Sequence, residues 1–173
     1  MRMEENKYDK VNIVPQRSLG GPPRVMSYSE TTDAQLWHLA KKYKIPIGGI
    51  CFKDELNNLI PQAGYGYIIN LADHTMHGTH WTCIYLDTPA KSKSAAYFDS
   101  FGQPMPTEAL KFIKRYGAKN IWVNKKDIQS YDSGWCGIYC LMFIRACAQY
   151  PKLSLQNRIV KYLHKFKNLN FII

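Results

Sequence analysis

The segment SGWCGIYCLMF, residues 133–143, decides how the chain is expected to fold. An apolar run through residues 135–148 predicts a buried helix with Cys136 at its N-terminus. Backbone N–H groups and the positive end of the helix dipole stabilise a thiolate at such a position. Cys136 is therefore the candidate nucleophile. The adjacent residues are the candidate substrate contacts, since glycine lets a substrate backbone approach the sulfur closely; they are Gly134, Trp135 and Gly137.

A cysteine nucleophile needs a base that accepts its proton and later delivers it to the leaving amine. His80 is the best placed of the five histidines, because it stands at the start of a predicted strand, residues 81–86. Asp99 ends the next predicted strand, residues 95–98, which should lie beside the first. A carboxylate there can hold one imidazole nitrogen so that the other faces the sulfur. We expect His80 to be the general base and Asp99 to orient it.

The negatively charged oxygen of a tetrahedral intermediate needs a hydrogen-bond donor beside the sulfur. Gln129 is separated from Cys136 by one short loop, so its amide can fold back and act together with the Cys136 backbone N–H. Such a donor typically lowers the barrier by about 2.7–4 kcal/mol. Asn124 is the weaker candidate for this role, because it is expected to end a strand.

A metal site is an alternative interpretation of the histidine-rich segment. His74, His77, His80 and Cys83 recur every three residues, and all four are of metal-ligating types. Cys83 lies inside a predicted strand, however, and strand geometry points it away from a preceding turn. The prediction is therefore that the chain binds neither a metal nor another cofactor.

The order of the predicted elements favours an α+β fold. Thr32 and Gln35 have the spacing of a capping box that opens a helix, and Pro46 with Gly48 and Gly49 predicts its end. Short links between consecutive strands favour antiparallel pairing over a doubly wound parallel sheet. We expect helices near residues 32–43, 108–116, 135–148 and 154–166, and strands near residues 65–71, 81–86, 95–98 and 121–123.

Length and composition predict one domain preceded by an arm. The chain has 173 residues, of which 46% are hydrophobic and 21% charged, which suits a single core. Residues 1–27 combine charges with proline and glycine pairs and are expected to be a flexible N-terminal arm, with residues 28–173 as the single domain. No apolar run approaches the ~20 residues of a membrane span. With no visible signal peptide and five cysteines in no disulfide framework, an intracellular protein is expected.

The net charge is +10, and the C-terminal third is basic, since no acidic residue follows Asp132. Arg158, Lys161 and Lys165 are expected on the outer face of the last helix, where they could contact DNA or another polyanion. A solvated basic face without a partner explains the same charges equally well.

The chain order His, Asp, Gln, Cys resembles that of the adenovirus-type maturation endopeptidases, in the wider clan that includes the SUMO-specific proteases. The resemblance covers residues 32–148, and its motifs are specific jointly rather than singly. They are HW at residues 80–81, YFDSFG at residues 97–102, Gln129, and CGIYCLMF at residues 136–143. The resemblance implies an α+β cysteine protease fold with a central, largely antiparallel sheet flanked by helices and the nucleophile at the N-terminus of a buried helix.

The resemblance also implies roles for individual residues. His80 would be the general base, Asp99 its orienting carboxylate and Cys136 the nucleophile. Gln129 would be the oxyanion donor, and Trp81 would wall the substrate groove. The implied substrates are capsid or virion precursor proteins cleaved after Gly-Gly or similar small residues. The enzyme would come from a virophage or a related small DNA virus and would act in the virion and the infected cell.

The chain departs from the family patterns at three places. Asp99 stands where adenovirus enzymes carry Glu, and no cysteine between Asp99 and Gln129 could hold a disulfide-linked peptide activator. Trp135 precedes the nucleophile where SUMO-type enzymes usually have Asp. Two alternatives stay open. One is a deSUMOylase- or deubiquitinase-like isopeptidase that acts on host proteins, and the other is a catalytically degenerate DNA-binding or scaffold protein.

Overall fold

The computed structural model describes residues 31–75, 80–89, 91–125, 127–128 and 134–164, together with the backbone of residues 15–16 and 27–28. Residues 15–16 and 27–28 form a short antiparallel pair, β1 (Pro15–Gln16) with β2 (Ser27–Tyr28). The rest of the expected N-terminal arm, residues 1–27, lies outside the described residues, so the domain boundary at residue 28 stays a prediction.

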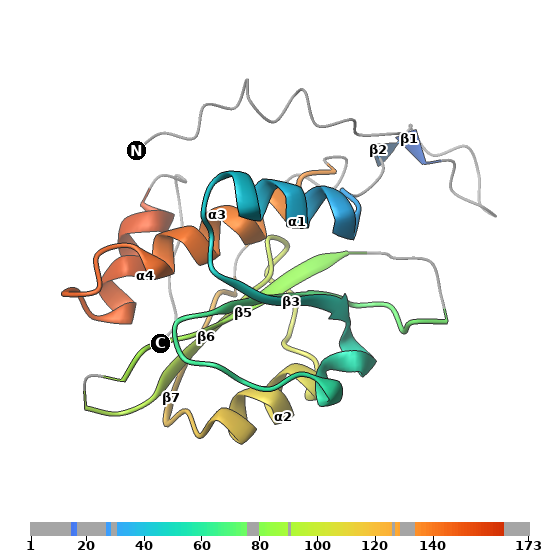
Figure 1. The fold of residues 1–173 in the computed structure, drawn as a ribbon. Helices are drawn as coiled ribbons and strands as arrows, with labels where there is room; N and C mark the ends of the chain where they lie inside the picture. The colour runs from blue at the N-terminus through green and yellow to red at the C-terminus, as the bar shows by residue number, and fades with distance from the viewer. Residues whose placement is uncertain are drawn as a thin grey trace.

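A five-stranded sheet forms the centre of the fold (Figure 1). Its strands lie in chain order: β3 (Ile47–Phe52), β4 (Gly66–Asn70), β5 (Trp81–Leu86), β6 (Ser94–Phe98) and β7 (Asn120–Val123). The middle strand, β5, is antiparallel to both its neighbours, whereas the outer pairs β3–β4 and β6–β7 are parallel. The α+β class is confirmed, and the antiparallel pairing predicted for the sheet holds for its three central strands.

The parallel outer strands require crossover connections, which a hairpin cannot supply. The 3₁₀ helix η2 (Lys53–Asn58) lies in the crossover from β3 to β4, and helix α2 (Thr107–Tyr116) lies in the crossover from β6 to β7. Both pack on the same face of the sheet, over a core that includes Leu56, Tyr67 and Phe112. This side of the sheet carries none of the three candidate catalytic side chains that the structure describes.

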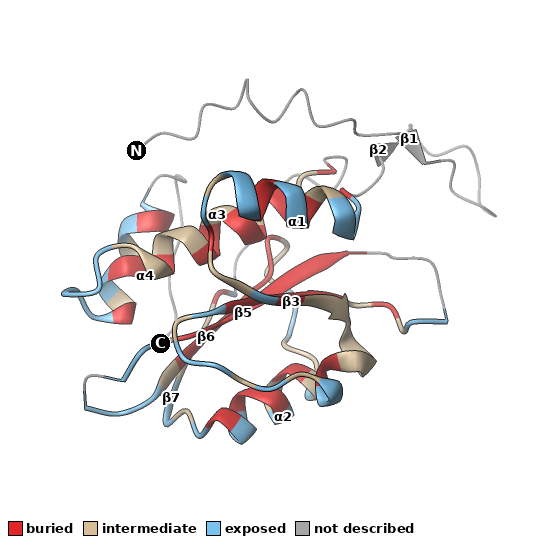
Figure 2. Cartoon of the chain, in the orientation of Figure 1, coloured by how far each residue is buried: buried red, intermediate tan, exposed pale blue. Residues whose placement is uncertain are grey.

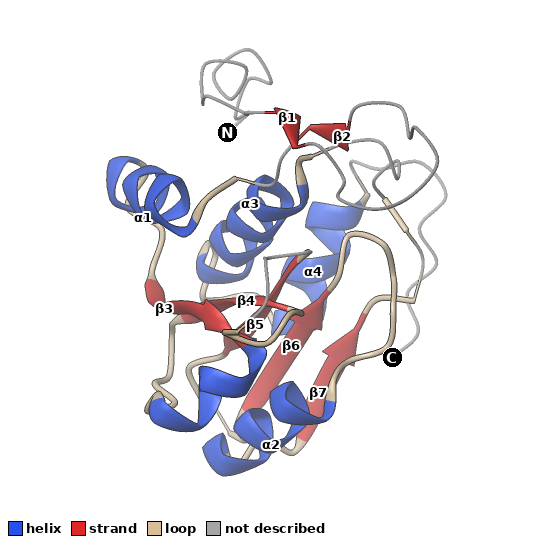
Figure 3. Cartoon of the chain, turned by 90° about the vertical axis from the view of Figure 1, so that its right-hand side faces the viewer, coloured by secondary structure: helices blue, strands red, loops and turns tan. Residues whose placement is uncertain are grey.

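The opposite face is covered by α1 (Asp33–Lys42), α3 (Cys136–Ala148) and α4 (Leu155–Leu163), as the turned view shows (Figure 3). Helix α3 is buried or partly buried around its circumference, since it lies between the sheet, α1 and α4 (Figure 2). Its approach to β4 needs a glycine, since a Cβ at Gly66 would overlap Ile144. The helix that begins with Cys136 is therefore held on three sides.

The first strand of this sheet, β3, is not among the elements predicted from the sequence, in which Gly48 and Gly49 indicate only the end of α1, a helix that does end at Lys42. Both glycines lie within β3, and packing explains them. A Cβ at Gly48 would lie 2.7 Å from the ring of Tyr67, and one at Gly49 would lie 2.6 Å from a methyl group of Leu59. Among the described residues, no helix is long and apolar enough to cross a membrane.

Candidate active site

The antiparallel pairing of β5 with β6 brings His80 and Asp99 together. His80 immediately precedes β5, and Asp99 immediately follows β6. The register pairs Cys83 with Phe98, so the start of one strand lies beside the end of the other. His80 Nε2 is 2.7 Å from Asp99 Oδ1. The two residues are 8% and 0% exposed, which places their contact in a buried, weakly screened environment.

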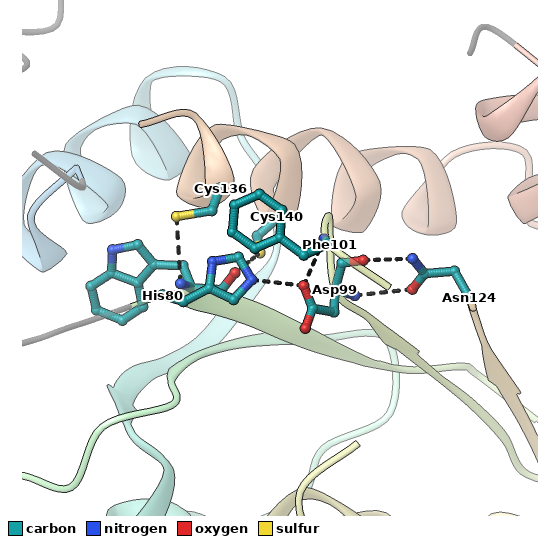
Figure 4. Close-up of polar contacts among 7 residues, drawn as sticks. His80, Asp99, Phe101, Asn124, Cys136 and Cys140 are labelled. Carbon is teal, nitrogen blue, oxygen red and sulfur yellow. Dashed lines mark hydrogen bonds and ion pairs between the residues drawn. The ribbon is translucent and has the colours of Figure 1, made fainter. Parts of the chain in front are cut away.

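This contact fixes which imidazole nitrogen can accept a proton. An ionised carboxylate only accepts hydrogen bonds, so His80 Nε2 carries the hydrogen and Nδ1 presents its lone pair. Nδ1 is buried and has no hydrogen-bond partner among the described residues. It lies on the side of the ring that faces Cys136 (Figure 4). The arrangement therefore presents a base to the sulfur and a carboxylate behind that base.

The turn after β6 holds both members of this pair. The Phe101 N–H donates to Asp99 Oδ1 at 2.8 Å, and the Gly102 N–H donates to the Asp99 carbonyl at 2.9 Å. Gly102 has a φ of +66°, a conformation in which glycine is the favoured residue. The turn lays the Phe101 ring on the imidazole of His80, with centroids 4.4 Å apart and planes 25° apart. Asp99 thus forms a turn and holds His80 at the same time.

Cys136 is the first residue of α3, with Trp135 at the N-cap position. Within the described part of the chain, no side chain caps this helix end, and its first internal bond runs from the Tyr139 N–H to the Trp135 carbonyl at 2.9 Å. The Trp81 N–H donates to Cys136 Sγ at 3.5 Å. A donated N–H and a helix N-terminus both stabilise a thiolate. Cys136 forms no disulfide, so its sulfur can act as a nucleophile.

Other cysteines of the chain lie in environments that keep them protonated. Burial and the carboxylates of Glu55 and Asp54 raise the pKa of Cys51 to about 12. Burial also raises the pKa of Cys83 and that of Cys147 above their usual range. A buried thiol with a raised pKa is a poor nucleophile near neutral pH. These three thiols therefore suit packing rather than catalysis.

The structure assigns Asn124 a place that the sequence did not indicate. Asn124 directly follows β7, which runs parallel to β6, and its side chain meets the main chain of Asp99. The Asp99 N–H donates to Asn124 Oδ1 at 3.0 Å, and Asn124 Nδ2 donates to the Asp99 carbonyl. The amide nitrogen thus binds the Asp99 carbonyl, in keeping with the ranking of Asn124 as the weaker of the two oxyanion candidates.

Gln129, the stronger oxyanion candidate, lies outside the described residues, and so does His77. The residue before Gln129 is described: the Ile128 N–H donates to the Ser100 carbonyl at 2.8 Å. This bond ties the chain just ahead of Gln129 to the turn that follows Asp99.

The candidate substrate contacts are largely covered by neighbouring elements. Trp81 is only 6% exposed, and its indole N–H donates to the Thr31 carbonyl at 2.7 Å, so it offers little surface to a groove. Gly134 is buried and Trp135 half-buried. A Cβ at Gly137 would lie 2.9 Å from a methyl group of Leu36 and 3.2 Å from the Trp81 ring. The packing of α1 and β5 against α3 thus favours glycine at position 137, and its expected contact with substrate stays a prediction.

The ligand types of the alternative metal site have separate partners. The His74 imidazole binds the Asp54 carboxylate, and its backbone N–H donates to the same carboxylate at 3.0 Å. His80 binds Asp99, and the Cys83 thiol lies 3.8 Å from the Cys140 carbonyl oxygen, to which it donates. Within the described residues, no group of three or more His, Cys, Asp or Glu could hold a metal ion.

The basic face expected on α4 is corrected at Arg158. This side chain is buried, with the residue 5% exposed, and its guanidinium lies 2.8 Å from both carboxylate oxygens of Asp87. It also donates to the carbonyls of Leu153 and Cys147. Arg158 therefore ties α4 to the end of β5 and cannot reach a phosphate. Lys161 is exposed, as predicted for a solvent-facing residue, and Lys165 lies outside the described residues.

The described side chains supply a sulfur at a helix N-terminus, an imidazole and a carboxylate in adjacent positions on an α+β sheet. A site of this composition on this fold defines the class of the protein, which is a cysteine peptidase.

The comparison with protein families gives the particular family within that class. Residues 56–171, about two thirds of the chain, match the family described as adenovirus endoprotease, and the chain belongs to that family. The resemblance drawn from the sequence motifs is thereby confirmed. No curated protein matches the chain in a direct comparison.

Solved structures of similar fold include two of the African swine fever virus (ASFV) pS273R protease. The selenomethionine form is 20% identical with a TM-score of 0.49, over 80% of this chain and 65% of that one. The second structure is 18% identical with a TM-score of 0.46, over 72% and 57%. A variant of AvrA with IP6 and CoA is 15% identical with a TM-score of 0.43, over 75% and 66%. The chain thus spans less than two thirds of the pS273R protease.

Proposed function

We propose that this cysteine peptidase is a viral maturation endopeptidase that cleaves capsid or virion precursor proteins after small, Gly-Gly-like residues. The observation that carries the proposal is the buried His80–Asp99 contact whose remaining imidazole nitrogen faces Cys136. Membership of the adenovirus endoprotease family supports the substrate class. Under this proposal the enzyme acts inside the infected cell and the virion.

In the proposed reaction, His80 Nδ1 takes the proton from Cys136 Sγ, and the thiolate attacks the carbonyl carbon of the scissile bond. The imidazolium then protonates the leaving amine, which departs and leaves a thioester on the sulfur. A water molecule gives a proton to His80 Nδ1 and attacks the thioester, releasing the carboxylic acid product and the thiol. Asp99 stays ionised throughout and stabilises the imidazolium that forms twice in each cycle.

Gln129 is proposed as the side-chain donor to the oxyanion, together with the backbone N–H of Cys136. The bond from the Ile128 N–H to the carbonyl of Ser100 supports this role. It ties the residue before Gln129 to the residue after Asp99. Replacement of Gln129 by Ala is expected to lower kcat by about 10²–10³-fold with a small change in KM, as expected for a group that acts on the transition state.

The preference for small residues has support in the surroundings of the nucleophile. Cys136 is 2% exposed, and its sulfur lies beside the Trp81 N–H at the edge of the packed core. A side chain of any size on the substrate residue that carries the attacked carbonyl would have to displace these groups. Glycine has no side chain and lets the peptide backbone approach the sulfur closely.

The test is cleavage of a Gly-Gly-containing peptide and of a capsid precursor by purified variants. Cys136→Ala is expected to be inactive on both substrates. Cys51→Ala is the matched control, because Cys51 is a partly buried thiol whose pKa is raised to about 12, and this variant should cleave at the wild-type rate. Substantial cleavage by Cys136→Ala would refute the assignment. Rapid labelling of Cys136 by a ubiquitin-like probe, without precursor cleavage, would favour the isopeptidase alternative.

DNA binding through the basic C-terminal region is a second proposal, now restricted to Lys161 and Lys165. Exposure of Lys161 favours it, and its ammonium group lies 4.0 Å from the centroid of the Tyr150 ring, an aromatic side chain that is itself 48% exposed. Each phosphate contact contributes a slope of about −0.9 to the logarithm of the affinity against that of the salt concentration. Lys161→Ala should remove about one phosphate contact and so make this slope less negative by about 0.9. An affinity for duplex DNA that is insensitive to salt would exclude the proposal.

A further inference from the structure

We propose that Asn124 is a positioning residue of the active site: its amide fixes the main chain at Asp99 and thereby directs the carboxylate towards His80. The inference rests on the function proposed above, since it concerns the same His80–Asp99 pair. It goes beyond that function because it places part of the catalytic geometry on β7, a strand that supplies none of the three reacting groups.

The contacts between Asn124 and Asp99 are reciprocal. The amide oxygen accepts the Asp99 N–H at 3.0 Å, and the amide nitrogen donates to the carbonyl of the same residue. Both residues are buried, at 6% and 0% exposure, so water does not compete freely for these groups. A side chain that bonds both main-chain groups of one residue fixes the position and the rotation of that residue together.

The carboxylate of Asp99 depends on this anchorage because one oxygen makes all its described contacts. Oδ1 accepts from the Phe101 N–H and from His80 Nε2. Oδ2 is buried and has no hydrogen-bond partner within the described ranges. The two contacts at Oδ1 therefore act without any described contact at Oδ2 that would hold the carboxylate if the main chain shifts. A displacement of about 1 Å in a catalytic group can cost a factor of about 10² in rate.

The fold brings the two residues together through the parallel pairing of β6 with β7. The register places Val123 beside Tyr97, so the residues that follow the two strands leave the sheet at the same edge. Asn is suited to the position because its amide offers one donor and one acceptor. Aspartate would lose the donor and add a negative charge beside the Asp99 carbonyl.

A double-mutant cycle tests the proposal in the full-length protein. Asn124→Ala should lower kcat about 10-fold on a Gly-Gly peptide and leave KM unchanged. Asp99→Ala keeps the main-chain groups that Asn124 binds but has no carboxylate to direct. Asn124→Ala should therefore change the residual single-turnover rate of the Asp99→Ala enzyme by less than about 2-fold, because an effect transmitted through the carboxylate disappears with it.

Tyr67→Phe is the matched control. The Tyr67 hydroxyl also makes one accepted and one donated bond to main-chain groups, from the Gln62 N–H at 2.9 Å and to the Ile60 carbonyl at 3.0 Å. It belongs to the core on the other face of the sheet. Tyr67→Phe should lower the melting temperature by an amount comparable to Asn124→Ala, and it should change kcat by less than about 2-fold in either background.

The outcomes separate the two levels of the argument. An equal loss of rate from Asn124→Ala in both backgrounds, or no loss in the wild type, would overturn the positioning role. Wild-type activity in Asp99→Ala would overturn the proposed function itself. If Asn124→Ala does not fold, Asn124→Asp supplies the same cycle, because the carboxylate keeps the acceptor for the Asp99 N–H and removes only the donor. Its loss of kcat should also vanish in the Asp99→Ala background.

Discussion

The described residues form two histidine–aspartate pairs, and only one of them has the geometry of a catalytic pair. His80 binds Asp99 with side chains that are 10% and 0% exposed, whereas His74 binds Asp54 with side chains that are 58% and 30% exposed. The His80 pair leaves a buried Nδ1 facing Cys136, but His74 uses its Nδ1 to hold Asp54. Burial and the direction of Nδ1 therefore distinguish the candidate catalytic base, His80, from the exposed His74–Asp54 pair.

Removal of the imidazole should give the largest difference in activity between variants of the two pairs. His80→Ala removes the only base that faces the sulfur among the described residues, and we expect kcat/KM to fall by at least about 10³-fold. His74→Ala should cleave at a rate within about 2-fold of wild type. The measurement is steady-state hydrolysis of a fluorogenic Gly-Gly peptide. Equal losses in the two variants would mean that the comparison assigns the base wrongly.

Removal of the carboxylate charge should give a smaller difference in activity between variants of the two pairs. Asp99→Asn keeps the size of the side chain but no longer stabilises the imidazolium, and kcat is expected to fall by about 10²–10³-fold, less than in His80→Ala. Asp54→Asn should leave kcat unchanged. The pH dependence of kcat/KM checks the cause, since only Asp99→Asn should alter it. An unaltered profile with a large fall in rate would point to misfolding instead.

The cover over the buried pair has a smaller predicted effect. The Phe101 ring stacks on His80, and such contacts contribute about 0.5–1.5 kcal/mol. Phe101→Ala keeps the backbone N–H that binds Asp99 but exposes the imidazole, which makes this pair more like the His74 pair. We expect kcat to fall by about 3–10-fold, with stronger inhibition by salt than in the wild type. A rate equal to wild type would show that the ring only fills space.

The His74–Asp54 pair should affect the stability of the protein rather than the rate of cleavage. The hydrogen bond with Asp54 raises the pKa of His74, and the same bond lowers the pKa of Asp54. The raised histidine pKa contributes stability that is complete below about pH 6.5 and is lost as pH rises through the folded value. The lowered aspartate pKa contributes stability that is complete above about pH 4 and is lost as pH falls through its folded value.

His74→Gln should therefore lower the melting temperature most between about pH 4 and 6.5, and its melting temperature should converge with that of the wild type on either side. The shift should be small, because the pair is exposed to solvent. Thermal unfolding over a pH series measures it. A difference that grows above neutral pH would contradict the assignment of the contact.

The adjacency of His80, Asp99 and Cys136 could be predicted from the sequence, because each stands at an end of a strongly patterned element. Strand and helix ends can be predicted locally, and the order of elements then brings these ends to one edge of the sheet. Asn124 could not be assigned in this way. Its partner Asp99 lies on a parallel strand across the α2 crossover, and no local pattern shows which main-chain groups a buried amide will meet.

The errors have the same physical origin. Arg158 fits the outward pattern of a basic amphipathic helix, but its partner Asp87 comes from the end of β5, far away in the sequence. Strand β3 was not predicted, because what favours glycine at position 48 is the ring of Tyr67 on the neighbouring strand, which leaves no local pattern. In both cases a contact between distant segments overrides a local preference. Gln129 follows a strand end and a described bond at Ile128, and its own position stays a prediction.

Two thiols of α3 bind the two main-chain groups of one residue in β5, Trp81. Cys136 accepts the Trp81 N–H, and Cys140, one helical turn later, donates to the Trp81 carbonyl, each at 3.5 Å. The buried Cys140 thiol thus helps to hold Cys136 at its distance from β5. Oxidation of Cys140 to a bulkier acid would push α3 away from β5 and displace the nucleophile. The complete burial of Cys140 protects against this damage.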